Sequence, residues 1–232
     1  MGALSGVVVA DFSRVLAAPY ATMLMADLGA DVIKVEHPER GDDTSSWGPP
    51  FAADEATYFL SVNRNKRSLG LDLSQAEGRR QARELASSAD VVVENFRPGT
   101  MAKYGLSYAD IRELNPRVVY CSITGFGSGA GAPLPGYDLL VQAVGGLMSV
   151  TGSAPGGYTL ASAVPGILGN RHSSIAPYEV FATSDGPIVL AVGNDRQFAA
   201  LCRGLGVDGL AQDSRFVTNP QRVAHVDELA EL

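Results

Sequence analysis

The sequence alternates short apolar segments with amphipathic ones, and this alternation restricts the fold more than any other feature. The first unit opens with a strand-like run at residues 6–10 that ends at Asp11, and a second such run at residues 32–36 closes it. The segment between them predicts a helix that ends at Gly29. One face of this helix carries apolar residues at helical spacing: Ala17, Tyr20, Ala21, Leu24 and Leu28. Units of this kind build parallel sheets.

Two further strand–helix units follow. Residues 69–73 alternate leucine with other residues as a short strand, and the valines at 91–93 form the next one. Ser74 with Glu77, and Ser107 with Asp110, have the spacing of capping boxes, which predicts a helix after each pair. The three helical residues expected to face inward in the first of these helices are Ala82, Leu85 and Ala86. With the strand-like run at 117–123, this predicts a doubly wound, Rossmann-like α/β domain with a parallel sheet.

Composition excludes several classes of function. The chain has 232 residues, of which 46% are hydrophobic, and a net charge of −7, so it offers no basic stripe for nucleic acid. It contains neither a membrane-length apolar run nor a secretory leader, which predicts a cytoplasmic protein without membrane association. The distant Cys121 and Cys202 have no disulfide or metal-ligand spacing, and buried, reduced thiols are expected.

Polar variety at the end of the 91–93 strand indicates a candidate site. In open α/β sheets, ligands bind outside the carboxyl ends of the strands. We therefore expect Asn95, Phe96 and Arg97 to lie near a bound molecule. A strand that simply runs into a turn is the alternative.

Two other segments carry open alternatives. Arg64, Lys66 and Arg67 could neutralise phosphate groups or could belong to a solvated turn. The polar segment at residues 37–58, which contains Trp47, is long enough to be functional or mobile.

The second part of the chain has a different composition. Residues 124–136 are rich in Gly and Pro, as in a flexible cover over a ligand. A helix is expected at 137–148, and two strand-like runs precede a helix that begins at Asn194. Asn219 is expected to cap a helix with Pro220 at its first position. We predict a large domain at residues 1–164 and a small α+β domain at 165–232.

Several segments, in this order, closely resemble the class III coenzyme A (CoA) transferases, which share their fold with α-methylacyl-CoA racemase. The segments are DFSRVLAAPYATMLMADLGADVIKVEHPERGDD, NRNKRSLGLDL, ADVVVENFRPG, LNPRVVYCSITGFG, GYDLLVQAVGG and GNRHSSIAPYEVF. The resemblance implies that CoA is a substrate and that no prosthetic group is needed. It also implies an acyl-CoA and a carboxylate as reactants and, for full-length relatives, an interlocked homodimer.

The resemblance also implies the residues that border CoA. The expected binding residues are Arg14, Val15, Leu16, Ala17, Arg40, Leu71, Asn95, Phe96, Arg97 and Lys103. Their chemistry is suitable, because a polyanion needs cations and helix-start amides, while the long thiol-bearing arm needs an apolar trough.

The family reaction moves CoA from an acyl-CoA to a carboxylate. An aspartate attacks the thioester to give a mixed anhydride, the thiolate returns to give an enzyme thioester, and a second acid takes the CoA. Covers rich in glycine would keep water from these intermediates. The racemase branch has a histidine where this chain has Tyr137. Because phenols ionise at about pH 10, Tyr137 favours the transferase branch. His172 is the other candidate base, but a structural or interface role is favoured.

The nucleophile is where this chain departs from the family. After Thr151, residues 152–172 contain no Asp or Glu, so a segment that carries the aspartate is expected to be missing between about 158 and 164. Asp138 matches a neighbouring carboxylate and is expected only to support catalysis, beside Tyr137. We therefore expect no transferase activity from this chain, and exposed apolar surface where the dimer's long connections are lost.

Two explanations of this departure stay open: a deletion in the gene, or a non-catalytic relative that keeps the CoA pocket. A racemase-like enzyme is a further alternative. A nucleotide-dependent oxidoreductase is disfavoured, because no GxGxxG fingerprint follows the first strand.

Overall fold

The computed structural model describes residues 2–151 and 171–232, which form two compact units. The first unit comprises Met1–Ser45 and Tyr58–Leu134, and the second comprises Ser46–Thr57 and Pro135–Leu232. The domain boundary predicted at residue 164 lies outside the described residues. Each unit is described by itself below.

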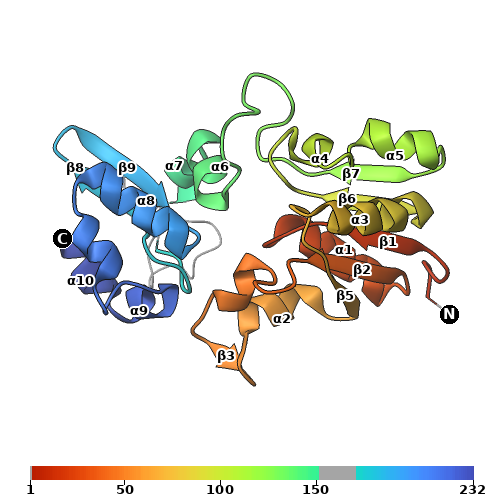
Figure 1. Cartoon of the computed structure of the whole chain (residues 1–232). Helices are drawn as coiled ribbons and strands as arrows, with labels where there is room; N and C mark the ends of the chain where they lie inside the picture. Colours follow the sequence, from red (N-terminus) through yellow and green to blue (C-terminus); the bar gives the residue numbers. More distant parts are fainter. Residues whose placement is uncertain (1, 152–170) are drawn as a thin grey trace. The chain divides into compact units, whose positions relative to one another are not determined.

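A parallel five-stranded sheet forms the centre of the first unit (Figure 1). Its strands are β1 (Val8–Asp11), β2 (Asp31–Glu36), β5 (Lys66–Gly70), β6 (Val91–Glu94) and β7 (Val119–Ser122). They lie in the order β5-β2-β1-β6-β7, and all four pairings are parallel. The order reverses between β1 and β6, so this is the switch point of a doubly wound sheet. The predicted fold class is confirmed.

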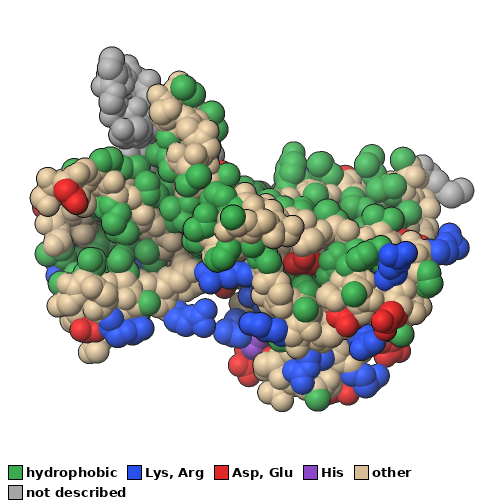
Figure 2. All heavy atoms as spheres, turned by 90° about the horizontal axis from the view of Figure 1, so that it is seen from above, with side chains coloured by type: hydrophobic (Ala, Val, Ile, Leu, Met, Phe, Trp, Pro, Cys, Tyr) green, Lys and Arg blue, Asp and Glu red, His purple; other side chains and the backbone are tan. Residues whose placement is uncertain are grey.

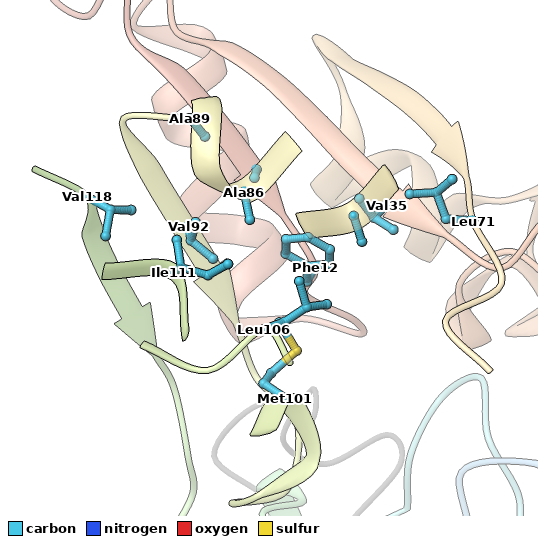
Figure 3. Packing of buried hydrophobic residues seen from close by; sticks show 12 residues of the cluster. Phe12, Val35, Leu71, Ala86, Ala89, Val92, Met101, Leu106, Ile111 and Val118 are labelled. Atoms are coloured by element: carbon cyan, nitrogen blue, oxygen red, sulfur yellow. The ribbon is translucent and has the colours of Figure 1, made fainter. Parts of the chain in front are cut away.

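Alternating residues of the strands supply two hydrophobic cores, one on each face of the sheet. Val9, Val32 and Val93 pack against helix α1 (Ala17–Asp27). On the other face, Ala10 and Val92 pack against residues of α3 (Ala76–Ser88), α4 (Thr100–Lys103) and α5 (Tyr108–Leu114). Figure 3 shows side chains of this second core converging from strands and helices. The period of two in each strand therefore explains why helices cover both faces.

Helix α1 packs on the sheet through small and medium residues and leaves its larger apolar ones outside. Its buried residues are Ala18, Pro19, Thr22, Met23 and Ala26. Tyr20, Leu24 and Leu28, from the apolar face noted in the sequence, are 42–50% exposed. Hydrophobic side chains also lie at the surface over much of the face in Figure 2. Helix α1 thus leaves large apolar side chains at the surface of the first unit, and the apolar surface expected where the long connections are lost stays a prediction.

Two of the four predicted helix starts are confirmed. Ser107 and Asp110 form the capping box of α5, and the Asn194 side chain accepts from the backbone N–H of Gln197 at the start of α8 (Asp195–Leu205). Each cap satisfies an N–H group that has no partner within the helix.

The other two starts were predicted wrongly. Gln75, not Ser74, precedes α3, and it makes no capping bond. The carboxylate of Asp72 accepts from the Ser74 amide at 2.8 Å, and Glu77 pairs with Arg80 instead of closing a box. In the last part of the chain, Thr218 rather than Asn219 caps α9 (Asn219–Ala224).

The second unit combines short helices with two antiparallel strand pairs. The pairs are β3 (Phe51–Ala52) with β4 (Glu55–Ala56), and β8 (Tyr178–Thr183) with β9 (Gly186–Ala191). Its other elements are α6 (Asp138–Val144), α7 (Leu147–Thr151), α8, the 3-10 helix η2 (Asp208–Gln212), α9 and α10 (Val226–Glu231). Val192, Phe198, Cys202 and Phe216 form a core beside the β8–β9 hairpin. This is the expected α+β character.

Two connecting elements complete the chain. They are the 3-10 helix η1 (Asp43–Ser46) and helix α2 (Thr57–Asn63). None of the helices in the described ranges has both the length and the apolar composition of a membrane span. Cys202 is buried, but Cys121 is exposed on the edge strand β7, so the prediction of two buried thiols is half wrong.

Candidate functional site

A pocket of about 100 Å³ lies in the first unit, outside the carboxyl ends of its strands. Its walls come from the last residues of β2 and from segments that follow β1, β2, β5 and β6. The lining residues are Phe12, Arg14, Val35, Glu36, His37, Arg40, Leu71, Asp72, Leu73, Ser74, Phe96 and Tyr104. The pocket therefore occupies the place where ligands bind in doubly wound sheets.

Four of the predicted binding residues meet in this pocket. Arg14, Arg40, Leu71 and Phe96 are far apart in sequence and line the same cavity. Leu71 is buried, Phe96 is half-buried, and the two arginines are exposed at the rim. Two guanidinium groups beside apolar walls suit a ligand with an anionic part and a flat or apolar part.

Arg14 and Phe96 form a stacked pair within the pocket. The guanidinium carbon of Arg14 lies 4.9 Å from the centroid of the Phe96 ring. The backbone N–H of Phe96 donates to the carboxylate of Glu94 at 2.9 Å, and Ser122 Oγ also contacts that carboxylate. A planar cation over an aromatic ring keeps its edge free to bind an anion.

The Asn95 side chain hydrogen-bonds to the backbone of Arg14 and does not line the pocket. Its Oδ1 accepts from the Arg14 backbone N–H at 2.8 Å, and its Nδ2 donates to the Arg14 backbone oxygen at 2.7 Å. The side chain thus pairs with Arg14 as a neighbouring strand would. The predicted importance of Asn95 has a structural basis, although its contact is to Arg14 and not to the cavity.

The remaining predicted binding residues do not line the pocket. Val15 has a φ of 68°, and Leu16 and Ala17 are exposed at the start of α1. Arg97 follows Phe96 and is exposed, as is Lys103, the last residue of α4. A ligand larger than the pocket would reach the start of α1.

Of the two alternatives for the cluster Arg64, Lys66 and Arg67, the solvated one describes the two arginines, whose side chains are 52% and 65% exposed. Arg64 pairs with Asp27 at 2.6 Å, and Arg67 pairs with Asp31 at 2.5 Å. Lys66 is buried, and its Nζ donates to Asp11 at 3.1 Å. Burial lowers the pKa of Lys66, and Asp11 opposes that shift. Each cation has an intramolecular carboxylate partner, and none of the three lines the pocket.

Sequence reasoning missed several residues of the pocket. His37, Asp72, Ser74 and Tyr104 line it beside the predicted residues. Hydrogen bonds from Ser74 lower the pKa of Asp72, and His37 adds to the effect. The rule that ligands lie at strand ends, applied to β2 and β5 as well as to β6, would have identified three of these four residues.

The predicted catalytic pair, Tyr137 and Asp138, lies in the second unit at the start of α6. Tyr137 Oη accepts from Gln197 Nε2 at 3.0 Å, and Asp138 Oδ2 accepts from Gln142 Nε2 at 2.6 Å. The carboxylate is exposed and the phenol is half-buried. Tyr137 is therefore oriented by Gln197, a residue that no sequence pattern marked.

Gly193 connects Tyr137 with the single tryptophan of the chain. The Gly193 carbonyl accepts from Trp47 Nε1 at 2.9 Å, and its N–H donates to Gln197 Oε1 at 2.7 Å. A Cβ at residue 193 would meet Tyr137 Oη at 3.1 Å. Trp47 is 3% exposed, so the polar segment around it carries a buried anchor of the second unit.

His172 lies among aromatic rings in the same unit. Its ring centroid is 5.1 Å from that of Tyr178 and 6.2 Å from that of Trp47, both edge to face. Its Nδ1 accepts from the Ser174 N–H at 3.0 Å. Burial lowers the pKa of His172 to about 4, against the opposing effect of Asp138. These contacts agree with the structural role that the sequence favoured.

Known proteins resemble the chain over nearly its whole length. A succinate–glutarate CoA-transferase of Agrobacterium fabrum is 42% identical, with 99% of this chain and 73% of that protein covered. A mouse succinyl-CoA:glutarate CoA-transferase is 38% identical, with 100% and 66% covered. The crystal structure of a CAIB/BAIF family protein from Brucella suis has 36% identity and a TM-score of 0.64, with 99% and 76% covered.

The chain thus spans 66–76% of the length of these relatives. The model of the family described as CoA-transferase family III matches it in two segments, residues 4–161 and 155–232. These matches, together with the doubly wound sheet, show that the chain belongs to CoA-transferase family III.

Proposed function

We propose that this chain holds CoA and acyl-CoA in the pocket of its first unit and is part of an enzyme that transfers CoA between carboxylic acids. The observation that carries the proposal is the meeting of Arg14, Arg40 and Phe96 at the strand ends. The two guanidinium groups would bind phosphates, and the aromatic and aliphatic walls would take the adenine or the pantetheine arm.

The proposed substrates are the CoA ester of a short dicarboxylic acid and a second such acid. The support comes from similar proteins, which are named as CoA-transferases for succinate and glutarate, for oxalate and for mesaconate. The racemase alternative has less support, because Tyr137 stands where a racemase has its histidine and is hydrogen-bonded to Gln197.

We propose that full-length members of the family transfer CoA through a covalent intermediate on an aspartate. The sequence predicts that this chain lacks that aspartate. The family model matches in two segments that meet at residues 155–161. The comparison with the A. fabrum protein extends over 291 positions, although the chain has 232 residues. Both findings support the prediction that tens of residues of the relatives have no counterpart here. In this proposal the carboxylate of Asp138 only supports catalysis.

Calorimetry with free CoA tests the binding proposal. We expect CoA to bind and pantetheine, which lacks the nucleotide phosphates, to bind at least tenfold more weakly. Arg14→Gln should reduce the difference between the two ligands. Absence of heat with CoA, or equal affinity for both ligands, would exclude this pocket as a CoA site.

Exchange of label between succinyl-CoA and glutarate tests the catalytic part. We expect no exchange by the 232-residue chain, and exchange by a chimera that carries the corresponding segment of the A. fabrum protein between Thr151 and Val164. The same chimera with its aspartates in that segment changed to alanine is the control. Exchange by the original chain would show that the nucleophile prediction is wrong.

We also propose a cytoplasmic location and, for the chimera that restores the missing segment, the homodimer expected of full-length relatives. Exposed Leu16, Tyr20 and Leu24 on one side of α1 support a protein surface that is covered in solution. Sedimentation equilibrium of the chain and of the chimera would measure the association directly. A monomer in both cases would contradict the dimer.

A further inference from the structure

The turn between β1 and α1 is held by side chains from four separate segments. Asp11 Oδ1 accepts from the Ser13 N–H at 3.0 Å, and Lys34 Nζ donates to the Ser13 carbonyl at 2.8 Å. Asn95 binds both backbone polar groups of Arg14. The carboxylate of Asp42 accepts from the Val15 N–H at 3.3 Å. Five consecutive backbone groups of the turn therefore have side-chain partners.

Val15 needs such a support more than its neighbours do. Its φ of 68° is a left-handed conformation, which is strained for a β-branched residue. Strain of this kind persists only where surrounding contacts determine the backbone. Asp42 lies on the loop after β2, 27 residues further along the chain, and supplies the contact at that position.

Asp42 is in turn held by a buried ion pair. Lys34 Nζ lies 2.9 Å from Asp42 Oδ2, and both side chains are at most 2% exposed. Thr44 donates to Asp42 Oδ1 from its N–H at 3.0 Å and from its hydroxyl at 2.8 Å. Burial alone would raise the pKa of Asp42, but Lys34 and Thr44 outweigh it and hold that pKa below its usual value. The carboxylate is thus kept as an anion beneath the turn.

We infer that Lys34 and Asp42 are positioning residues for coenzyme binding, which act by holding the Ser13–Val15 backbone so that Arg14 lies over Phe96 at the pocket. Lys34 and Asp42 are absent from the pocket wall, and they reach the ligand only through this turn. The inference rests on the proposed CoA site.

A charge-free double variant separates positioning from folding. Replacing both partners of a buried ion pair by apolar residues of similar volume is often neutral for stability, whereas removing one partner is not. The double variant leaves no unpaired buried charge, but backbone groups of Ser13, Val15 and Thr44 lose their side-chain partners. We therefore expect Lys34→Met/Asp42→Leu to stay folded at room temperature and to unfold at a lower temperature than the unmodified protein. Because the Ser13 carbonyl and the Val15 N–H lose their partners, its affinity for CoA should fall at least tenfold.

A double-mutant cycle tests whether the effect passes through Arg14. In an Arg14→Gln background, the same two replacements should change CoA affinity less than threefold, since the group that they position is already absent. The control is Asp27→Ala/Arg64→Ala, which removes an ion pair of the same unit away from the turn and should leave CoA affinity unchanged. A folded Lys34→Met/Asp42→Leu protein with unchanged affinity, or an effect of equal size in both backgrounds, overturns the inference.

Amide exchange distinguishes failure of the inference from failure of the proposed CoA site. If the unmodified protein binds no CoA, the proposed function fails. The positioning role is then read from the Val15 amide, which should exchange faster in the double variant while amides of α3 do not change. If the double variant does not fold, the exchange rate of the Val15 amide in the unmodified protein tests the inference instead. A Val15 amide that exchanges as fast as an exposed loop amide would overturn the inference.

Discussion

Asn95 and Arg14, 81 residues apart in sequence, exchange two hydrogen bonds of 2.8 and 2.7 Å across the switch point of the sheet. The amide of Asn95 thereby substitutes for a neighbouring strand just where β1 and β6 end. This contact holds the backbone from which the Arg14 side chain reaches Phe96. The segment after β6, which the sequence pattern marked as a candidate site, and the segment of Arg14, which the family resemblance marked, thus form one structural feature.

Replacing Asn95 by alanine should weaken CoA binding about tenfold and lower the free energy of unfolding by about 1–3 kcal/mol, because both Arg14 backbone groups lose a partner. Calorimetry and urea unfolding measure the two effects. Asn115→Ala is the matched control, since Asn115 also donates to a backbone carbonyl of this unit, that of Ala89, at 2.9 Å. It should lower stability and leave CoA affinity as it is. Equal loss of affinity in both variants would contradict a specific role for Asn95.

A methyl group at Gly78 should disturb the pocket from the side of α3. Its Cβ would lie 2.1 Å from the carbonyl oxygen of Asp72, so the turn that carries Asp72 and Ser74 into the pocket wall must move. We expect Gly78→Ala to lower the free energy of unfolding by about 1–3 kcal/mol and to weaken CoA binding. Gly204→Ala in α8 is the control, because a Cβ there meets no atom within 4 Å. That change should stabilise the helix by up to about 1 kcal/mol.

His172 should make the second unit less stable in acid. Its pKa is about 4 in the folded protein and near 6.5 when unfolded, so between these values the unfolded chain binds more protons. Stability is therefore lost as the pH falls from about 6.5 to 4, by about 3 kcal/mol in total. Urea unfolding of the unmodified protein and of His172→Gln should show this loss only in the former. The same pH dependence in both proteins would assign it to other groups.

Trp47→Phe should destabilise the second unit, because it removes the donor to the Gly193 carbonyl and part of a buried ring. The expected decrease in the free energy of unfolding is about 1–3 kcal/mol. Unfolding followed by circular dichroism measures it, since the variant has no tryptophan. Tyr108→Phe, an exposed aromatic residue of the first unit, should have an effect below about 0.5 kcal/mol. An equally small effect of Trp47→Phe would show that the segment is not anchored through this residue.

The sequence by itself determined the order of strands and helices, because periods of two and of 3.6 residues are local properties of the chain. It also placed Asn95 and Phe96 at a strand end, and the capping box of Ser107 with Asp110 needs only neighbours in the sequence. Arg14 and Arg40 were predicted as binding residues from the resemblance to a family, and not from the hydrophobic periodicity.

Only the tertiary structure decided which groups pair across long distances. Both faces of α1 are rich in apolar residues, and close packing on the sheet selected Ala18 and Met23 for burial over Tyr20. Lys66 and Lys34 look like surface cations in the sequence, yet each is buried against an aspartate. Pairing of this kind depends on which strand ends the fold brings together. The hydrophobic pattern therefore predicted the sheet, and the folded sheet decided which charges hold the turn at the pocket.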